Sequence, residues 1–241
     1  TGLWALNFVW GAGVILLTVL WILFQPRVRL STQTWFLGLM FISLVDWMFV
    51  DASLITFRHR DQVLSEGVAA AAFLDAQQGS NRIYSPSYSL PQQTAAYHEF
   101  EIADGVDPLQ ISAYADFMKD ASGVSVDGYS VTLPPFEGGD PQDANAAYTP
   151  DAALLGLLNV AYVVSEFEID TPGLLFEQRA GSSWIYKNEY AYPRAWVQSV
   201  DGKISSDAGL VWTPNQIQVR ASGPGRLVLS EIDYPGWRVE V

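Results

Sequence analysis

The chain contains no cysteine and only two histidines, His59 and His98. The absence of cysteine excludes disulfides, thiolate metal sites and a cysteine nucleophile, and it permits an extracytoplasmic domain without disulfides. Two histidines are too few for a histidine-rich metal site. His98 would have to be the base of any Ser-His-Asp relay, and no Gly-x-Ser-x-Gly motif accompanies it. We therefore expect no metal site, no cofactor and no hydrolase triad.

Basic residues are scarce beyond the first quarter of the chain. Four of the 13 basic residues and two of the 26 acidic ones precede Asp61, which leaves nine basic and 24 acidic residues in the remainder. A domain this acidic repels phosphate backbones, so nucleic acid is excluded as a partner. The acidic domain should also stay off an anionic membrane surface except where it is tethered.

Charge is nearly absent from two apolar runs, one from Leu3 to Phe24 and one from Trp35 to about Phe57. As a helix the first run would reach about 33 Å, enough for a bilayer core of roughly 30 Å. We interpret residues 3–24 and 35–57 as a transmembrane hairpin. The alternative is two buried helices of a soluble core, but such helices are rarely apolar on every side for six turns. A signal peptide is disfavoured because no basic n-region precedes the first run.

The short turn between the two runs sets the expected orientation. It carries Arg27 and Arg29, and basic residues in a short loop favour the cytoplasmic side. The hairpin then places everything after Phe57 outside the cytoplasm. Because the chain begins with Thr1 and stops within a strand-like alternation at 237–241, we expect an internal piece of a longer multi-pass protein of the bacterial cell membrane.

Two carboxylates, Asp46 and Asp51, interrupt the second apolar run. A carboxylate at mid-bilayer costs about 2.5–3.5 kcal/mol on insertion scales, so it usually faces a polar interior. Asp46 is therefore a candidate intramembrane polar residue that faces other helices or substrate. The alternative is that the apolar run ends earlier and both carboxylates lie at the outer interface, which we favour for Asp51.

The part from 58 to 165 reads as helix-rich α+β. Helix-forming composition, caps and turn residues predict helices over 65–78 with Ser65 as N-cap, 91–100, 108–120 with Asp107 as N-cap, and 151–158. Strands are predicted over 81–86 and 160–164, and a long surface loop over 123–149.

The part from 166 to 241 reads as mainly antiparallel β and as truncated at its C-terminal end. Strands are predicted over 174–178, 184–187, 195–198, 216–221, 226–230 and 237–241. Residues 216–220 and 226–230 alternate and are joined by Gly and Pro, which predicts a hairpin. The expected fold is thus a transmembrane helical hairpin followed by an α+β extracytoplasmic domain.

Aromatic residues gather around an arginine in the segment 189–197. Tyr192 and Trp196 could stack on the apolar face of a sugar while Arg194 takes an anionic oxygen. The alternative, which we favour, is an ordinary strand entry in which Arg194 pairs with an acid. No residue of this segment is expected to be catalytic.

A second candidate platform is the Pro-Gly turn at 235–236, with Tyr234 and Trp237 on either side of it. Such a turn can present aromatic rings to a glycan, although an aromatic core that caps the turn is more common. Asp140, Asp143 and Asn145 could supply oxygens to Ca²⁺, but the EF-hand spacing is missing, so we disfavour a calcium site.

An ordered series of motifs resembles the bacterial YfhO family of multi-pass membrane proteins, over nearly the whole chain. The motifs are Leu44-Val45-Asp46-Trp47, Arg82-Ile83-Tyr84-Ser85-Pro86, Ala103-Asp104-Gly105-Val106-Asp107-Pro108, Leu154 to Val164, Tyr192-Pro193-Arg194-Ala195 and Leu227 to Trp237. Where the family usually has Lys or Arg before the tyrosine, this chain has Ala161.

The resemblance implies a glycosyltransferase-like protein that moves a sugar from a polyprenyl-phosphate donor to an envelope polymer such as teichoic acid. The catalytic carboxylate of such proteins is expected upstream, so the resemblance transfers no catalytic residue to this chain. Our main hypothesis is a domain that positions glycan acceptor or donor through Tyr192, Arg194, Trp196, Tyr234 and Trp237. The competing hypothesis is a non-catalytic, membrane-anchored interaction or assembly domain.

Overall fold

The computed structural model describes residues 2–24, 27, 31–55, 57–77, 79, 81–125, 128–136, 141–213 and 215–240. The chain divides into two compact units, Thr1–His59 and Arg60–Val241. Three residues named above, Thr1, Arg29 and Asp140, lie outside the described residues, as do positions 78 and 241 at the ends of predicted elements.

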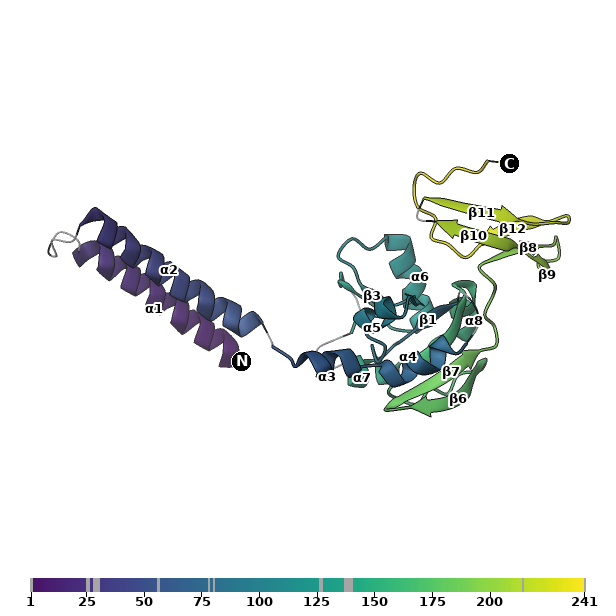
Figure 1. Ribbon diagram of the computed structural model, residues 1–241, viewed down its shortest axis with the longest axis horizontal. Coiled ribbons are helices and arrows are strands. Elements are labelled where there is room, and N and C mark those ends of the chain that lie inside the picture. Colours follow the sequence, from purple (N-terminus) through teal and green to yellow (C-terminus); the bar gives the residue numbers. More distant parts are fainter. Residues whose placement is uncertain are drawn as a thin grey trace. The chain divides into compact units, whose positions relative to one another are not determined.

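The N-terminal unit is a pair of helices, α1 (Gly2–Phe24) and α2 (Thr32–Leu54), which lie side by side in Figure 1. Ser31 caps α2, because its Oγ accepts a hydrogen bond from the Thr34 amide at 3.2 Å. Trp10 joins the helices, since its ring stacks on Phe49 with centroids 3.9 Å apart and its Nε1 donates to Asp46 Oδ1 at 3.0 Å.

Apolar side chains cover the outside of both helices, as at Phe8 and Trp47, which are 79% and 73% exposed. Among the described residues, one helix, Thr32–Ala52, is long and apolar enough to cross a membrane, and none of that stretch is buried. The apolar stretch described for α1, Phe8–Phe24, is shorter.

The second unit begins with two short helices in place of the single helix predicted over 65–78. Ser65 is the last residue of α3 (Arg60–Ser65), and its Oγ donates to the Gln62 carbonyl. Gly67 then takes the left-handed conformation, φ 71°, before α4 (Val68–Asp75). The prediction of Ser65 as an N-cap is therefore wrong, because Gly67 breaks the helix.

A five-stranded mixed sheet forms the centre of this unit, with the order β2-β1-β5-β7-β6. Its strands are β1 (Arg82–Tyr84), β2 (Glu101–Ile102), β5 (Val160–Ser165), β6 (Leu174–Ala180) and β7 (Ser183–Asn188). β1 pairs in parallel with β2 and β5, while β7 pairs antiparallel with β5 and β6. The predicted division at 165/166 thus falls between β5 and β6, two strands of one sheet.

Strand alternation sends consecutive residues of this sheet into two separate cores. Tyr84 and Val163 pack in one core with Met118 and Leu155, which come from the helices α6 (Ser112–Ser122) and α8 (Ala152–Leu157). The neighbouring Ile83, Val164 and Ile185 pack in the other core, beneath α4 and α5 (Gln92–Tyr97). Helices therefore cover both faces of the sheet, which explains why the strand residues are apolar on both sides.

The helix predicted over 108–120 begins later than expected. Asp107 accepts a hydrogen bond from the Leu109 amide at 2.8 Å and so caps a turn, while α6 starts at Ser112. It ends at Ser122, two residues past the predicted end, where Gly123 takes the left-handed conformation, φ 73°. Asp151 caps α8 by accepting from the amides of Ala153 and Leu154.

The region predicted as a long loop contains short elements. They are β4 (Thr132–Leu133), α7 (Pro141–Ala144) and the 3₁₀ turn η1 (Asn145–Ala147). β4 pairs with β3 (Gly105–Val106), and the Leu133–Pro134 peptide bond is cis. A two-stranded pairing this short has no apolar alternation that a sequence pattern could reveal.

The C-terminal strands form two small antiparallel sheets, which lie together in the yellow-green part of Figure 1. The strands are β8 (Ala195–Gln198), β9 (Ile204–Asp207), β10 (Gly209–Thr213), β11 (Gln216–Arg220) and β12 (Arg226–Leu229). β8 lies between β12 and β9, and β10 pairs with β11. The antiparallel character predicted for this part is confirmed.

The predicted hairpin between 216–220 and 226–230 is wrong. β11 pairs with β10 across a tight connection in which Thr213 faces Gln216, and β12 pairs with the more distant β8. A short local turn costs little chain entropy, which favours the β10–β11 pairing. The predicted strand at 237–241 is also absent over the described residues, where the Trp237 amide bonds only back to the Tyr234 carbonyl.

Substituting Gly156 tests the packing of α8 against the segment after β7. A Cβ on Gly156 would lie 2.1 Å from the Tyr190 carbonyl oxygen, so Gly156→Ala should lower the free energy of unfolding by about 1–3 kcal/mol in urea denaturation. Gly209→Ala is the control, because its nearest atom would be 3.9 Å away and its effect should stay within about 0.5 kcal/mol. Equal effects would contradict the close approach at Gly156.

Candidate functional site

Arg82, on strand β1 between β2 and β5, is the most heavily engaged charged side chain of the candidate site. Its Nη1 donates to the carbonyls of Leu158 at 3.1 Å and Ser230 at 2.8 Å. Its Nη2 binds Glu231 Oε2 at 3.1 Å, and its Nε lies 3.4 Å from Glu101 Oε2. The side chain is only 13% exposed, so these partners replace water around the guanidinium.

Arg194 completes the cluster from the other side. Its Nη1 binds Glu101 Oε2 and its Nη2 binds Glu231 Oε1. The side chain is 10% exposed, and Glu231 is 20% exposed. The two arginines and two glutamates thus form a charge-balanced ring, which we call the arginine–glutamate cluster. It joins β1, β2 and the segment before β8 to the segment after β12.

An open cleft of about 410 Å³ lies directly beside this cluster. One side is α6, through Tyr114 and Phe117, and another is the face of β8 and β12 that carries Trp196 and Val228. The other walls are the end of α8, through Leu157 and Leu158, and the segment 230–233, which includes Glu231 and Asp233. The cleft therefore has an apolar, partly aromatic floor and a few polar groups on its walls, the usual make-up of a small-molecule site.

One of the predicted glycan-binding residues lines this cleft, and a second packs against it. Trp196 lines it, is 4% exposed, and has no hydrogen-bond partner for its Nε1 among the described residues. Tyr192 packs on Trp196 with centroids 4.8 Å apart. The Tyr192 carbonyl accepts from Asn159 Nδ2 at 2.7 Å, which holds this segment against the end of α8.

Arg194 follows the alternative that the sequence left open. Its guanidinium is bound by Glu101 and Glu231, so an ordinary ion-paired strand entry describes its surroundings. Tyr234 and Trp237 are 60% and 51% exposed and follow the cleft wall in the chain. Both residues are accessible, but neither lines the cleft that Trp196 lines.

In the N-terminal unit, Asp46 points toward the other helix, because its Oδ1 accepts from Trp10 Nε1. Asp51, one turn and a half later, is exposed. A role for Asp46 toward further helices or substrate stays a prediction.

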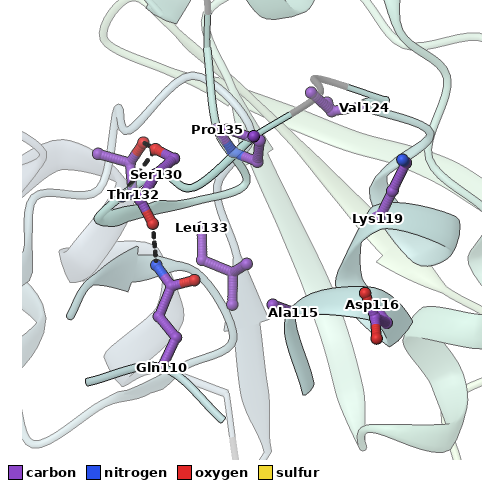
Figure 2. Close-up of a pocket in the computed structure, with 10 residues that line it drawn as sticks. Gln110, Ala115, Asp116, Lys119, Val124, Ser130, Thr132, Leu133 and Pro135 are labelled. Atoms are coloured by element: carbon purple, nitrogen blue, oxygen red, sulfur yellow. Dashed lines mark hydrogen bonds between the residues drawn. The ribbon is translucent and has the colours of Figure 1, made fainter. Parts of the chain in front are cut away.

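A second, smaller cavity of about 220 Å³ lies between α6 and the chain around β4 (Figure 2). Gln110, Ser130 and Thr132 line one side, and Asp116 and Lys119 of α6 line the other. The polar groups on the first side bind one another, with Gln110 Nε2 on the Ser130 carbonyl at 2.9 Å and the two hydroxyls 2.7 Å apart. None of the residues predicted to bind glycan lines this cavity, so we favour the larger cleft.

Asp104 is a buried carboxyl next to three tyrosines. Burial raises its pKa from 3.8 to about 7, although the Ser85 amide donates to Oδ1 at 2.7 Å and partly offsets the shift. Burial also raises the pKa of Tyr84, Tyr88 and Tyr114, and the Asp104 charge adds to each shift. Asp104 lines neither cavity, so we regard it as a structural group.

The described residues contain no group of three or more histidine and acidic side chains placed to hold a metal ion. Asn145, one of the residues considered for calcium, is 1% exposed and donates to the Pro86 carbonyl at 2.8 Å. Its side-chain amide therefore stabilises the fold around Pro86.

Sequence reasoning did not predict which residues form the cluster with Arg194. Arg82, Glu101 and Glu231 are separated by up to 149 positions and share no motif, so no local spacing predicts their meeting. The available signal was indirect: Arg82 is a charged residue at the head of an apolar strand, where a buried partner is required.

Removing Arg82 tests the cluster. Arg82→Ala would leave Glu231 paired with one arginine only, and it would remove the guanidinium donor from two backbone carbonyls. We therefore expect a loss of about 3–5 kcal/mol in the free energy of unfolding, measured in urea. The control is Arg179→Ala, which removes an exposed guanidinium that sits 4.6 Å over Trp184 and should cost less than about 1 kcal/mol. Similar losses for both would show that the cluster adds nothing beyond a surface contact.

Asp104 makes stability depend on pH in a defined direction. Because its pKa is higher in the fold than in the unfolded chain, the fold retains a proton between pH 3.8 and about 7 that the unfolded chain releases. In that window its contribution to stability falls by about 1.4 kcal/mol per pH unit as pH rises.

Asp104→Asn removes this titration, so the variant should lose less stability than the unmodified chain between pH 5 and pH 8. Asp120→Asn, which removes the same charge from an exposed site on α6, should leave the slope nearly unchanged. Urea denaturation at each pH measures both, and parallel slopes for all three proteins would argue against a buried titrating carboxyl.

Comparison with known proteins adds no relative to this description. No family model, no curated protein and no solved structure matches the chain.

Proposed function

We propose that this chain is the C-terminal part of a polytopic bacterial membrane protein of the YfhO type, whose second unit positions a glycan beside the bilayer. In this proposal α1 and α2 cross the membrane and their basic turn is cytoplasmic. The second unit is then extracytoplasmic and faces the cell envelope. The glycan is either the polyprenyl-phosphate-linked donor or the acceptor polymer.

The surfaces of α1 and α2 support the membrane part of the proposal. Large apolar side chains cover them, and water would solvate such helices poorly. The Asp46 carboxylate bonds to Trp10, so part of the cost of placing it in hydrocarbon is offset. The basic Arg27 in the connection favours the cytoplasmic side.

The observation that carries the glycan part is the cleft beside the arginine–glutamate cluster. Sugars are bound by aromatic surfaces that cover their apolar faces and by carboxylates and amides that receive their hydroxyls. Phe117 and Trp196 supply the first kind of group, and Glu231, Asp233 and Gln198 supply the second. Tyr234 and Trp237 then offer further stacking surfaces outside the cleft.

This chain itself supplies binding rather than chemistry in the proposal. The cleft presents neither a histidine nor a cysteine among its lining residues, and Glu231 is held by two arginines. Any transfer reaction of the longer protein would use a carboxylate outside these 241 residues, as the family resemblance implies.

A non-catalytic interaction or assembly domain is the second candidate, and one observation favours it. The C-terminal strands leave several large apolar side chains exposed, among them Val211 at 62%, Trp212 at 52% and Leu227 at 44%. Such surfaces mark protein contacts in many domains. This candidate predicts association without saccharide affinity.

Binding to a glycan array separates the two candidates. The full chain in lipid nanodiscs should bind defined envelope-type saccharides, and Trp237→Ala should weaken that binding about ten-fold, equivalent to about 1.4 kcal/mol for a lost stacking ring.

Trp212→Ala is the matched control, because Trp212 and Trp237 are 52% and 51% exposed and both belong to the C-terminal strands and tail. It should leave saccharide affinity unchanged. A chain that binds no saccharide would favour the interaction domain, whereas binding that both tryptophan variants change alike would exclude Trp237 from the saccharide site.

A further inference from the structure

The Glu231 carboxylate stands at the junction of the cleft and the cluster. It lines the cleft, and each of its oxygens already receives one guanidinium, Oε1 from Arg194 and Oε2 from Arg82. An ionised carboxylate has about four lone-pair positions, so two arginines leave it able to accept further hydrogen bonds. Because both arginines are nearly buried, the carboxylate is held in one orientation before any ligand arrives.

Two of the three arginines that the structure describes around the cleft, Arg82 and Arg194, are paired with carboxylates within the protein. Arg82 and Arg194 are bound to Glu101 and Glu231, and Arg226 on the cleft wall donates to Gln198 Oε1 at 2.9 Å. Asp233, also on the wall, adds a negative charge. A phosphate or carboxylate ligand would therefore meet the acidic groups Glu231 and Asp233 and would have to compete with carboxylates for Arg82 and Arg194.

The floor of the cleft fits an uncharged ring. Phe117, Trp196 and Val228 provide apolar surface, and the buried Trp196 Nε1 has no partner among the described residues. A pyranose has one apolar face for such a floor and hydroxyl groups around its rim. Those hydroxyls can donate to the Glu231 carboxylate and to Gln198 Oε1.

We propose that the cleft binds a neutral saccharide, with Glu231 as the hydroxyl acceptor and Arg194 as the residue that positions Glu231. This rests on the proposed glycan-binding function and specifies its ligand class and its site. It also changes the role of Arg194. The sequence suggested that Arg194 contacts an anionic oxygen of the ligand, whereas here it acts on the ligand only through Glu231.

Isothermal titration calorimetry of the full chain tests the proposal. The chain is held in lipid nanodiscs because sugar-based detergents would compete for the cleft. Maltose and N,N′-diacetylchitobiose serve as neutral probes and digalacturonic acid as the anionic one. The unmodified chain should bind at least one neutral probe, and digalacturonic acid at least ten-fold more weakly. Glu231→Gln should weaken the neutral probe at least ten-fold.

Glu101→Gln is the matched control. Glu101 bonds to the same two arginines but does not line the cleft, so its loss should change affinity less than two-fold. Circular dichroism confirms that both variants remain folded. A positioning role for Arg194 gives one further signature: Arg194→Lys should weaken binding alone, but have no additional effect once Glu231→Gln is present.

Each result decides a different point. If the unmodified chain binds none of the saccharides, the glycan function and this site both fail. If it binds but Glu231→Gln and Glu101→Gln behave alike, the function survives and the site fails. Tighter binding of digalacturonic acid overturns the neutral ligand class, and additive effects of Arg194→Lys and Glu231→Gln reduce Arg194 to a structural residue.

Discussion

The hydrogen bonds and ion pairs of the Arg82 guanidinium are the interactions on which the second unit depends most. Arg82 sits on β1, which pairs in parallel with both of its neighbours, β2 and β5, and it reaches carbonyls at the end of α8 and after β12. Breaking such a buried group away from its partners costs far more than a surface ion pair gains. The chain must therefore bring Ser230 and Glu231 back to β1, and this return fixes where β12 and its partner β8 can lie.

The five-stranded sheet holds Arg82 in the position at which Ser230 and Glu231 bind it. Ile83 and Tyr84 are neighbours in sequence but enter different cores, as do Val163 and Val164. With helices on both faces, a shift of β1 by one residue would exchange an apolar core residue for the charged Arg82. The same register that builds the two cores therefore sets the direction of the guanidinium. The register of β1 therefore determines both the stability of the sheet and the geometry of the cluster.

Much of the local structure could be predicted from the sequence, and little of the tertiary pairing. The strand at 195–198, the helix predicted over 151–158 and the end of the helix predicted over 108–120 follow from residue type within a few positions. Residues 216–220 and 226–230 were rightly predicted as strands, but alternation says only which face is apolar and not which strand lies alongside. Ile204 to Asp207 is too polar to signal β9. For the site, Trp196 and Tyr192 did meet, whereas the cleft wall at 230–233 could be placed only once the Arg82 partners were known.

The location of the cleft follows from the same chemistry. β8 starts directly after Arg194, and the Ser230 amide after β12 donates to the Arg194 carbonyl, so both strands enter the cleft wall from the cluster. A ligand that contacts Glu231 therefore touches the point where β1, β8 and β12 are tied together. Any ligand that prefers the folded state adds to its stability by mass action, and here that gain would act on the long-range contacts that local sequence cannot secure. If the proposed site binds its ligand, binding and folding of the C-terminal strands would rely on the same two arginines.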